Sequence, residues 1–197
     1  MQAAHWSGPE GDAYTERQTL SIESRTKMYA QVAADPSRRI HSLIEFGANG
    51  GSNLRAWRSI NTPIRLGGVE INDSAVERLR LVADVVHHAS MLDDIDFGVW
   101  DMSLTRGVLI HISPDSLNKA YETLYNASNR YICITEYYSP TPRMIPYRGK
   151  DNLLWARDFA GEMMDLYPLK LVDYFFTYHR DPSYPQDDVT TFIMERK

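Results

Sequence analysis

Short apolar segments alternate with helix-like stretches along most of this sequence, and that alternation leaves few architectures open. The apolar segments are rich in Val, Ile, Tyr and Phe and are bounded by Gly, Pro, Asn or Asp, which is typical of buried strands. Strands that are separated by helices need crossover connections, and crossovers produce a parallel sheet. The predicted strands are Ile40–Phe46, Ile64–Glu70, Asp84–His88, Val99–Thr105, Arg130–Glu136, Leu171–Tyr178 and Val189–Glu195.

Helix starts can be read between several of these strands. A capping box over Ser74–Glu77 predicts a helix there, and Ser113 before Pro114 predicts another that continues to about Ser128. An apolar stripe predicts a third helix over Asp151–Tyr167. The last two strands have no helix between them, so we expect them to form an antiparallel hairpin at one edge of the sheet.

Composition indicates a single globular domain over residues 1–197, with 43% hydrophobic and 24% charged residues. The one cysteine, Cys133, excludes a disulfide framework and a cysteine-based zinc site. The net charge of −5 disfavours binding to duplex nucleic acid, which needs a basic surface. No apolar run is long enough to cross a bilayer and no export signal is visible, so a cytoplasmic protein without a membrane partner is predicted.

A glycine-rich segment follows the first predicted strand and leads into a helix. Gly47 and Gly51 allow the backbone to turn sharply and approach a ligand closely, next to free amides at the helix start. A dinucleotide fingerprint needs glycine where this chain has Asn49 and Ser52, which argues against a nicotinamide or flavin cofactor. Glu45 precedes the first glycine by two residues, and Asn49 tolerates left-handed dihedral angles.

The second predicted strand ends on Glu70, 25 residues after Glu45, and a carboxylate there can accept both hydroxyls of a ribose. These two segments resemble motifs I and II of class I methyltransferases that use S-adenosylmethionine (SAM). The resemblance implies SAM as the cofactor, with Glu45 fixing the loop and Gly47, Asn49 and Gly51 passing the methionine moiety. It also implies a Rossmann-like α/β fold with helices on both faces of a seven-stranded, mostly parallel sheet that ends in an antiparallel hairpin.

The same resemblance implies a contact to adenine after the third strand. Ser90 occupies the place of the usual acidic residue, Asp93 is an alternative to it, and Met91 can pack on the adenine face. The Asp93-Asp94 pair has no third hard ligand nearby, so no metal site is predicted.

The segment after the fourth strand faces the sulfonium in methyltransferases, and here it carries His111. An imidazole can take a hydroxyl proton near neutral pH, so His111 is the candidate general base, with a structural core histidine as the alternative. His87 and His88 are interpreted as strand residues.

Residues 137–150 follow the fifth strand and contain three basic residues, three tyrosines and no acid. Positive charge and aromatic rings suit an anionic, hydroxyl-rich ligand, so this loop is predicted to bind the acceptor, a small molecule. The alternative is a solvated loop. The candidate contacts are Tyr137, Tyr138, Arg143, Tyr147 and Arg148.

A narrower resemblance covers nearly the whole chain, namely to the methyltransferases associated with pseudaminic acid biosynthesis. It implies SAM-dependent transfer in nonulosonic-acid or surface-glycan pathways, and an N-terminal helical cap over residues 1–35 in which Tyr14 and Arg17 close over the cofactor. The segments that carry it are Trp6…Gly8…Gly11-Asp12-Ala13-Tyr14-Thr15-Glu16-Arg17, Glu45–Asn53, Gly107–Ile112, Tyr137–Gly149 and Arg157–Glu162.

Two other functions stay open at this stage. One is methyl transfer to a different small metabolite, because motif I carries no information on the acceptor. The other is a non-catalytic protein that binds SAM or a glycan precursor. No sequence pattern indicates an oligomeric state.

Overall fold

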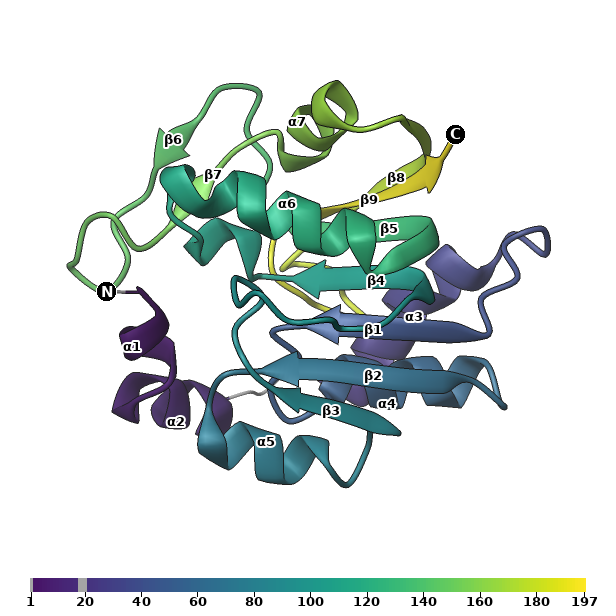
Figure 1. Cartoon of the computed structure of the whole chain (residues 1–197), viewed down its shortest axis with the longest axis horizontal. Coiled ribbons are helices and arrows are strands. Elements are labelled where there is room, and N and C mark those ends of the chain that lie inside the picture. The colour runs from purple at the N-terminus through teal and green to yellow at the C-terminus, as the bar shows by residue number, and fades with distance from the viewer. Residues whose placement is uncertain (1, 18–20) are drawn as a thin grey trace.

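The computed structural model describes residues 2–17 and 21–197, and its centre is a seven-stranded sheet of order β3-β2-β1-β4-β5-β9-β8 (Figure 1). All seven predicted strands are confirmed, each with ends within two residues of the prediction. The strands are β1 (Ser42–Phe46), β2 (Arg65–Glu70), β3 (Val85–His88), β4 (Trp100–Arg106), β5 (Ser128–Glu136), β8 (Leu169–Thr177) and β9 (Val189–Arg196).

The first five strands are parallel, and β9 inserts antiparallel between β5 and β8. The hairpin at the edge is therefore confirmed, with β8 as the outermost strand. Because β1, β2, β4 and β5 run in one direction, the loops that leave their carboxyl ends meet at one edge of the sheet, where open α/β folds bind ligands.

Helices cover both faces of the sheet, as predicted. Leu54 and Trp57 of α4 pack with α3 on one face, and Leu124 of α6 and Met163 of α7 pack on the other. These side chains are fully buried, so they anchor the two layers of the core. The helices are α3 (Ile22–Ala33), α4 (Ser52–Ile60), α5 (Asp73–Leu79), α6 (Leu117–Asn126) and α7 (Phe159–Leu166).

The prediction of a helix over Asp151–Tyr167 is wrong in its first half. The helix begins at Phe159 behind the capping side chain of Asp158, and the residues before it are extended. Trp155–Ala156 form β7, which pairs antiparallel with β6 (Arg143–Met144). The apolar stripe continued through this segment because its side chains are buried against the α6–α7 layer while the backbone is extended.

Two predicted helix starts also differ. Asn72 caps α5 by accepting the Ala75 N–H at 3.0 Å, because the hydroxyl of Ser74 instead donates to Asp12 in the N-terminal segment. After Ser113, residues Pro114–Ser116 form a 3-10 turn before α6 begins.

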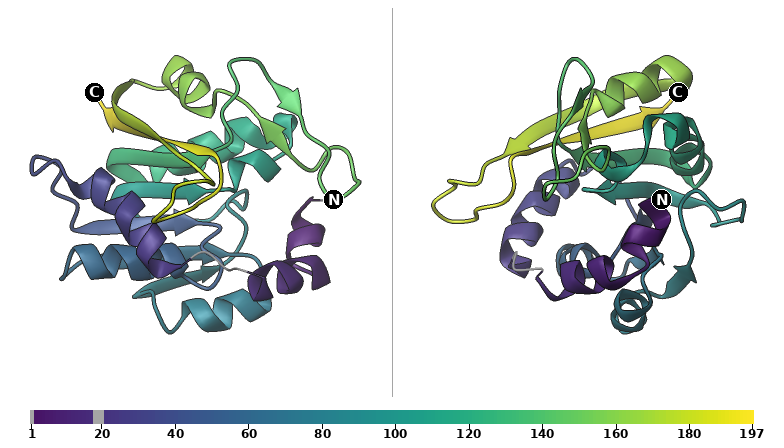
Figure 2. Two further views of the ribbon diagram at one scale, coloured as in Figure 1. Left: turned by 180° about the vertical axis from the view of Figure 1, so that it is seen from behind. Right: turned by 90° about the vertical axis from the view of Figure 1, so that its left-hand side faces the viewer.

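Two short N-terminal helices, α1 (Gln2–Trp6) and α2 (Pro9–Glu16), lie beyond the arrowheads of β1, β2 and β4 (Figures 1 and 2). The Asn72 side chain donates to Asp12 at 2.9 Å, so α2 is docked on the turn that follows β2. Of the predicted cap over residues 1–35, α1 and α2 lie at this edge, whereas α3 packs against α4. Residues 1 and 18–20 of the cap lie outside the described residues.

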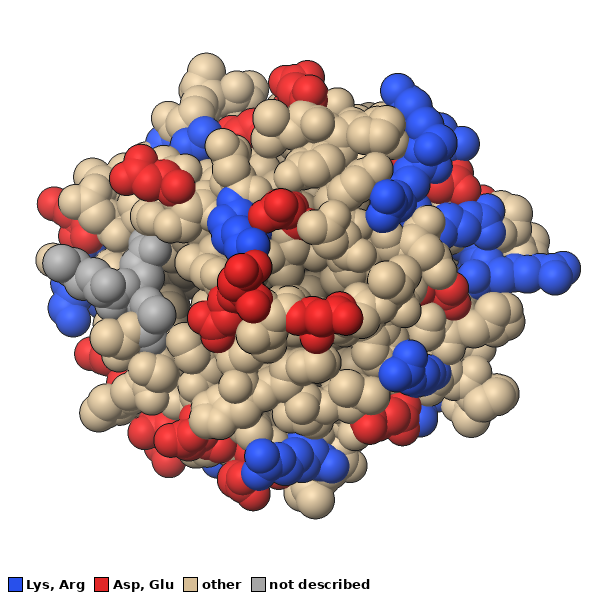
Figure 3. All heavy atoms as spheres, viewed as in Figure 1, with Lys and Arg blue, Asp and Glu red and all other residues tan. Residues whose placement is uncertain are grey.

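No helix in the described part of the chain is long and apolar enough to cross a membrane. On the face seen in Figure 3, basic side chains gather at the upper right, at the opposite end from the carboxyl edge of the parallel strands. No continuous basic band crosses that face.

Candidate functional site

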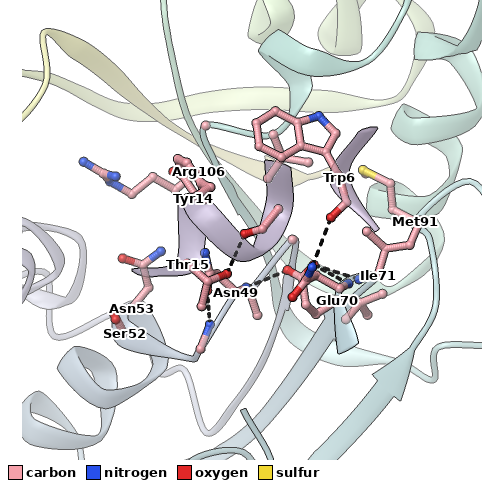
Figure 4. Close-up of a pocket in the computed structure, with 18 of the residues that line it drawn as sticks. Trp6, Tyr14, Thr15, Asn49, Ser52, Asn53, Glu70, Ile71, Met91 and Arg106 are labelled. Carbon is pink, nitrogen blue, oxygen red and sulfur yellow. Dashed lines mark hydrogen bonds between the residues drawn. The ribbon is translucent and has the colours of Figure 1, made fainter. Parts of the chain in front are cut away.

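A cavity of about 400 Å³ lies at the carboxyl edge of the sheet, beneath α1 and α2 (Figure 4). It brings together most of the predicted cofactor contacts, although they come from four strand ends and the N-terminal segment. Those that line it are Tyr14, Gly47, Asn49, Glu70, Ser90 and Met91, whereas Glu45, Gly51 and Arg17 do not, and the candidate base His111 lines it as well.

The loop after β1 is built from left-handed residues. Gly47, Asn49 and Gly51 have φ values of 69°, 48° and 78°, so Asn49 supplies the conformation for which glycine is otherwise used. A Cβ at Gly47 would lie 2.5 Å from a methyl carbon of Val108, which explains glycine at that position. Gly51 lies outside the cavity and caps α4.

Glu70 connects the two strand ends that form the floor of the cavity. Its Oε2 accepts the Asn49 N–H at 2.8 Å, and its Oε1 accepts the N–H groups of Ile71 and Asn72 at 2.8 and 2.9 Å. Only 8% of the residue is exposed, so the carboxylate is fixed in position at the cavity wall. These bonds use both lone pairs of Oε1 and one of Oε2, so the second lone pair of Oε2 can accept a hydrogen bond from a ligand.

Glu45 lies beneath the loop rather than in the cavity. It accepts a hydrogen bond from the Asn53 side chain at 2.5 Å, and Arg25 of α3 in turn donates to Asn53. The residue is 1% exposed, and burial raises the pKa of its carboxyl from 4.5 to about 8. Glu45 is therefore mostly protonated at neutral pH and supports α4 through Asn53.

Arg106, which the sequence analysis missed, ends β4 and lines the cavity. Its side chain is 7% exposed, its Nη2 donates to Gln186 at 3.3 Å, and it lies 3.7 Å from the Asp187 carboxylate. Within residues 2–17 and 21–197, its buried Nε has no hydrogen-bond partner. A basic residue directly after a central strand was the available signal, because such a position always faces the ligand edge.

The N-terminal segment contributes Trp6, Tyr14 and Thr15 to the cavity. Burial is the main cause that raises the pKa of the Tyr14 phenol. Arg17, which follows α2, is exposed and is not among the residues that line the cavity.

The loop after β3 forms an apolar wall. Met91 is 5% exposed and lies opposite the β2 end, near Ile71 (Figure 4). The Ser90 hydroxyl accepts the Leu92 N–H at 3.1 Å, and the Ser90 N–H donates to Asp93 at 2.9 Å. Asp93 thus folds back onto its own turn, and Ser90 and Met91 are the residues that face the cavity.

His111 lies on a 3-10 turn (Leu109–His111) that the buried Glu136 holds in place. The Glu136 carboxylate accepts the N–H groups of Val108, Leu109 and Ile110 at 3.1, 3.2 and 3.4 Å. Burial raises the pKa of Glu136 to about 7 in spite of these bonds.

The imidazole of His111 has a defined tautomer. Its Nδ1 lies 2.6 Å from the carbonyl oxygen of Leu153, which can only accept, so Nδ1 carries the proton and Nε2 has a free lone pair. The rings of Trp6 and Tyr147 lie 4.6 and 5.2 Å from it, centroid to centroid. Burial lowers the pKa of His111 from 6.5 to about 4, so the ring is neutral across the physiological range.

The predicted acceptor loop divides between two places. Tyr137, Tyr138 and Arg143 line a second cavity of about 460 Å³, together with His179, Asp187 and Asp188 from the β8–β9 connection. Tyr147 packs instead on His111, and Arg148 lies over the Tyr147 ring at 5.7 Å and lines neither cavity.

No protein-family model matches the chain, and no curated protein sequence matches it. Solved structures do match in fold. Magnesium protoporphyrin IX methyltransferase from Synechocystis PCC 6803, crystallised with SAM, superposes with a TM-score of 0.73 and 10% identity, over 99% of this chain and 95% of its own.

Two further structures give the same result. A Burkholderia thailandensis 1,6-didemethyltoxoflavin-N1-methyltransferase, bound to that substrate and S-adenosylhomocysteine, has a TM-score of 0.69 and 12% identity, with coverage of 98% and 85%. A SAM-dependent methyltransferase from Leishmania major has a TM-score of 0.66 and 14% identity, with coverage of 100% and 77%. The chain therefore has the Rossmann-like fold of SAM-dependent methyltransferases, which confirms the predicted fold class.

The buried Glu45 carboxyl makes stability depend on pH. Because its folded pKa is raised above its ordinary value, folding binds a proton there. The free energy of unfolding should therefore fall by up to about 1.4 kcal/mol per pH unit from about pH 4.5 to 8. Glu45→Gln keeps the acceptor for Asn53 and removes the titration. Urea unfolding at pH 5 and pH 8 should show a smaller decline in the variant, and equal declines would contradict the prediction.

Proposed function

We propose that this protein transfers a methyl group from SAM to a small, hydroxyl-rich, anionic acceptor. The observation that carries the proposal is the first cavity: in a methyltransferase fold, it combines a fixed carboxylate at the end of β2, a left-handed turn after β1 and a buried arginine after β4.

The cavity residues fit the parts of SAM. Glu70 Oε2 accepts only the Asn49 N–H, so it retains a lone pair for a ribose hydroxyl, whereas Oε1 is already used by two backbone N–H groups. Met91 and Ile71 offer apolar surface to the adenine ring, and the turn around Asn49 offers its backbone to the methionine part. The unpartnered Nε of Arg106 suits the methionine carboxylate. SAM supplies an activated methyl group on a sulfonium.

The chain's own contribution is to position the reactants and exclude water. Trp6 from α1 covers His111 and contacts Tyr147, so the N-terminal helices close the cavity from above. The neutral Nε2 of His111 is available to accept a proton from an acceptor hydroxyl.

The second cavity suits the acceptor, because a contact connects it to the first. Arg106 lines the first cavity and lies 3.7 Å from the carboxylate of Asp187, which lines the second. Hydroxyl and charged groups line the second cavity, which suits a sugar acid or a nucleotide-linked sugar and agrees with the resemblance to proteins of nonulosonic-acid and surface-glycan pathways.

Other acceptors are the main alternative, since the magnesium protoporphyrin and toxoflavin methyltransferases named above share the fold and act on other small molecules. A non-catalytic SAM-binding protein is the second. Calorimetry with SAM, followed by transfer of a labelled methyl group into a fractionated metabolite pool, separates them. Label in the anionic sugar fraction supports the proposal, whereas binding without transfer supports the non-catalytic alternative.

Glu70→Gln should weaken SAM binding by about 1.5–3 kcal/mol, because the amide replaces a charge-assisted acceptor of the ribose hydroxyls. Titration calorimetry measures the change. Glu77→Gln, on the exposed side of α5, is the matched control and should bind SAM like the parent protein. Equal affinities for both variants would remove Glu70 from the cofactor site.

Arg106→Met should weaken SAM binding about 10- to 100-fold by removing the partner of the methionine carboxylate. Binding of 5′-methylthioadenosine, which lacks that carboxylate, should be unchanged. Arg17→Met is the control for a nearby arginine outside the cavity. A loss of affinity for both ligands would mean that Arg106 acts only by supporting the fold.

His111→Ala should lower turnover about 10²–10⁴-fold if its Nε2 accepts the acceptor proton, and SAM affinity should be kept. Because burial lowers the pKa of His111 to about 4, the imidazole stays neutral from pH 5 to 8. The turnover of the parent protein should therefore be constant over that range and fall only at lower pH, where the ring becomes protonated. Histidine proton resonances recorded against pH test the pKa directly. A ring that titrates near pH 6.5 would contradict the burial of His111.

A further inference from the structure

Four aromatic side chains are exposed in one region near the second cavity: Tyr138, Tyr174, Phe176 and Tyr178, here called the aromatic strip. Their exposed fractions are 45%, 64%, 59% and 45%, which is unusual for large rings. Tyr174 and Phe176 alternate along β8, so their side chains share one face of the sheet, and Tyr178 follows directly after the strand.

The strip leads into the second cavity by two series of ring contacts. Tyr174 stacks on Phe192 with centroids 6.1 Å apart, and Phe192 contacts Tyr138, which lines the cavity. Phe176 contacts Tyr178, and Tyr178 packs at 4.8 Å on His179, which also lines the cavity. The rings and the cavity therefore form one continuous surface.

One cation at this junction is available to an anionic group. Both carboxylates of the second cavity have partners: Asp188 lies 2.7 Å from His179, and Asp187 lies 3.7 Å from Arg106. Arg143 lies on the same wall, is exposed, and makes no ion pair with any acid among the described residues. The Arg143 guanidinium is therefore free to pair with a phosphate.

We propose that the acceptor is a nucleotide-linked sugar, with its nucleobase stacked on the aromatic strip, its phosphates on Arg143 and its sugar in the second cavity. Aromatic rings stack on nucleobases of any sequence, and the arginine guanidinium pairs with phosphate in a two-point fork. This inference rests on the proposed function and selects between a free and a nucleotide-linked sugar.

A second copy of the chain is the alternative occupant of the strip, because Tyr, Phe and Arg are also enriched at protein interfaces. Pairing of two copies through the β8 edge is opposed by Lys170 and Asp173, because charged side chains on an edge strand hinder pairing.

The experiment measures binding of UDP, uridine and inorganic pyrophosphate by calorimetry. The protein is saturated with S-adenosylhomocysteine, so that the first cavity is filled. UDP should bind more tightly than either fragment, because it uses the strip and Arg143 together. Tyr174→Ser and Phe176→Ser should each weaken UDP about 5- to 100-fold and leave pyrophosphate unchanged. Arg143→Met should weaken both UDP and pyrophosphate.

Two matched variants serve as controls. Tyr184→Ser removes another tyrosine of the β8–β9 connection, and Arg148→Met removes the arginine that lines neither cavity. Both should bind UDP like the parent protein. Because the substituted rings are mostly exposed, all variants should also keep the parent's melting temperature.

The results separate the two proposals. If the parent protein does not bind S-adenosylhomocysteine, the proposed function itself is rejected. If it binds S-adenosylhomocysteine but binds UDP no more tightly than pyrophosphate, only the nucleotide-linked acceptor is rejected. The same holds if the strip variants bind UDP as tightly as the parent protein does. A parent dimer that dissociates in Tyr174→Ser, measured by light scattering, would also reject it, because the strip would then be a subunit interface.

Discussion

The carboxylate of Glu70 is the contact on which the cofactor cavity depends. It joins the turn after β1 to the turn after β2 by accepting three backbone N–H groups. One comes from Asn49, and the other two come from Ile71 and Asn72. Parallel strands leave such amides without partners at their carboxyl ends, and a fixed anion satisfies them without closing the site. Asn72, at the end of the same turn, also holds the N-terminal helices.

Glu136 repeats this arrangement at the end of β5, where it accepts three backbone N–H groups of the turn that carries His111. Glu45, the fourth residue of β1, is different: among the described residues its side chain has no backbone partner and no ion pair, and its raised pKa follows from burial. The site edge therefore uses acidic side chains in two ways. Glu70 and Glu136 hold turns through backbone N–H groups, and Glu45 supports α4 through Asn53.

Arg106 lines the first cavity and contacts the connection that lines the second. Among the described residues its Nε has no hydrogen-bond partner, while its Nη2 contacts the β8–β9 connection through Gln186 and Asp187. Gln186 also donates to the backbone of α3 at 2.8 Å, so the connection that lines the second cavity is attached to the layer that supports the first. This arrangement couples the proposed cofactor and acceptor sites through a small number of contacts.

The sequence by itself determined the strands and their directions, because burial periodicity and turn residues are local properties. The resemblance to methyltransferase motifs pointed to Glu70, Met91 and the glycine-rich turn, which line one cavity in the structure. Tertiary structure decided the rest. The segment around Trp155 is apolar at helical spacing, yet its backbone is extended. Arg17 follows α2 and Arg25 lies in α3, but only Arg25 lines the cavity. Arg25 and Arg106 are 81 residues apart and line the same cavity only because the tertiary fold brings α3 to the end of β4, and no local pattern records such a pairing.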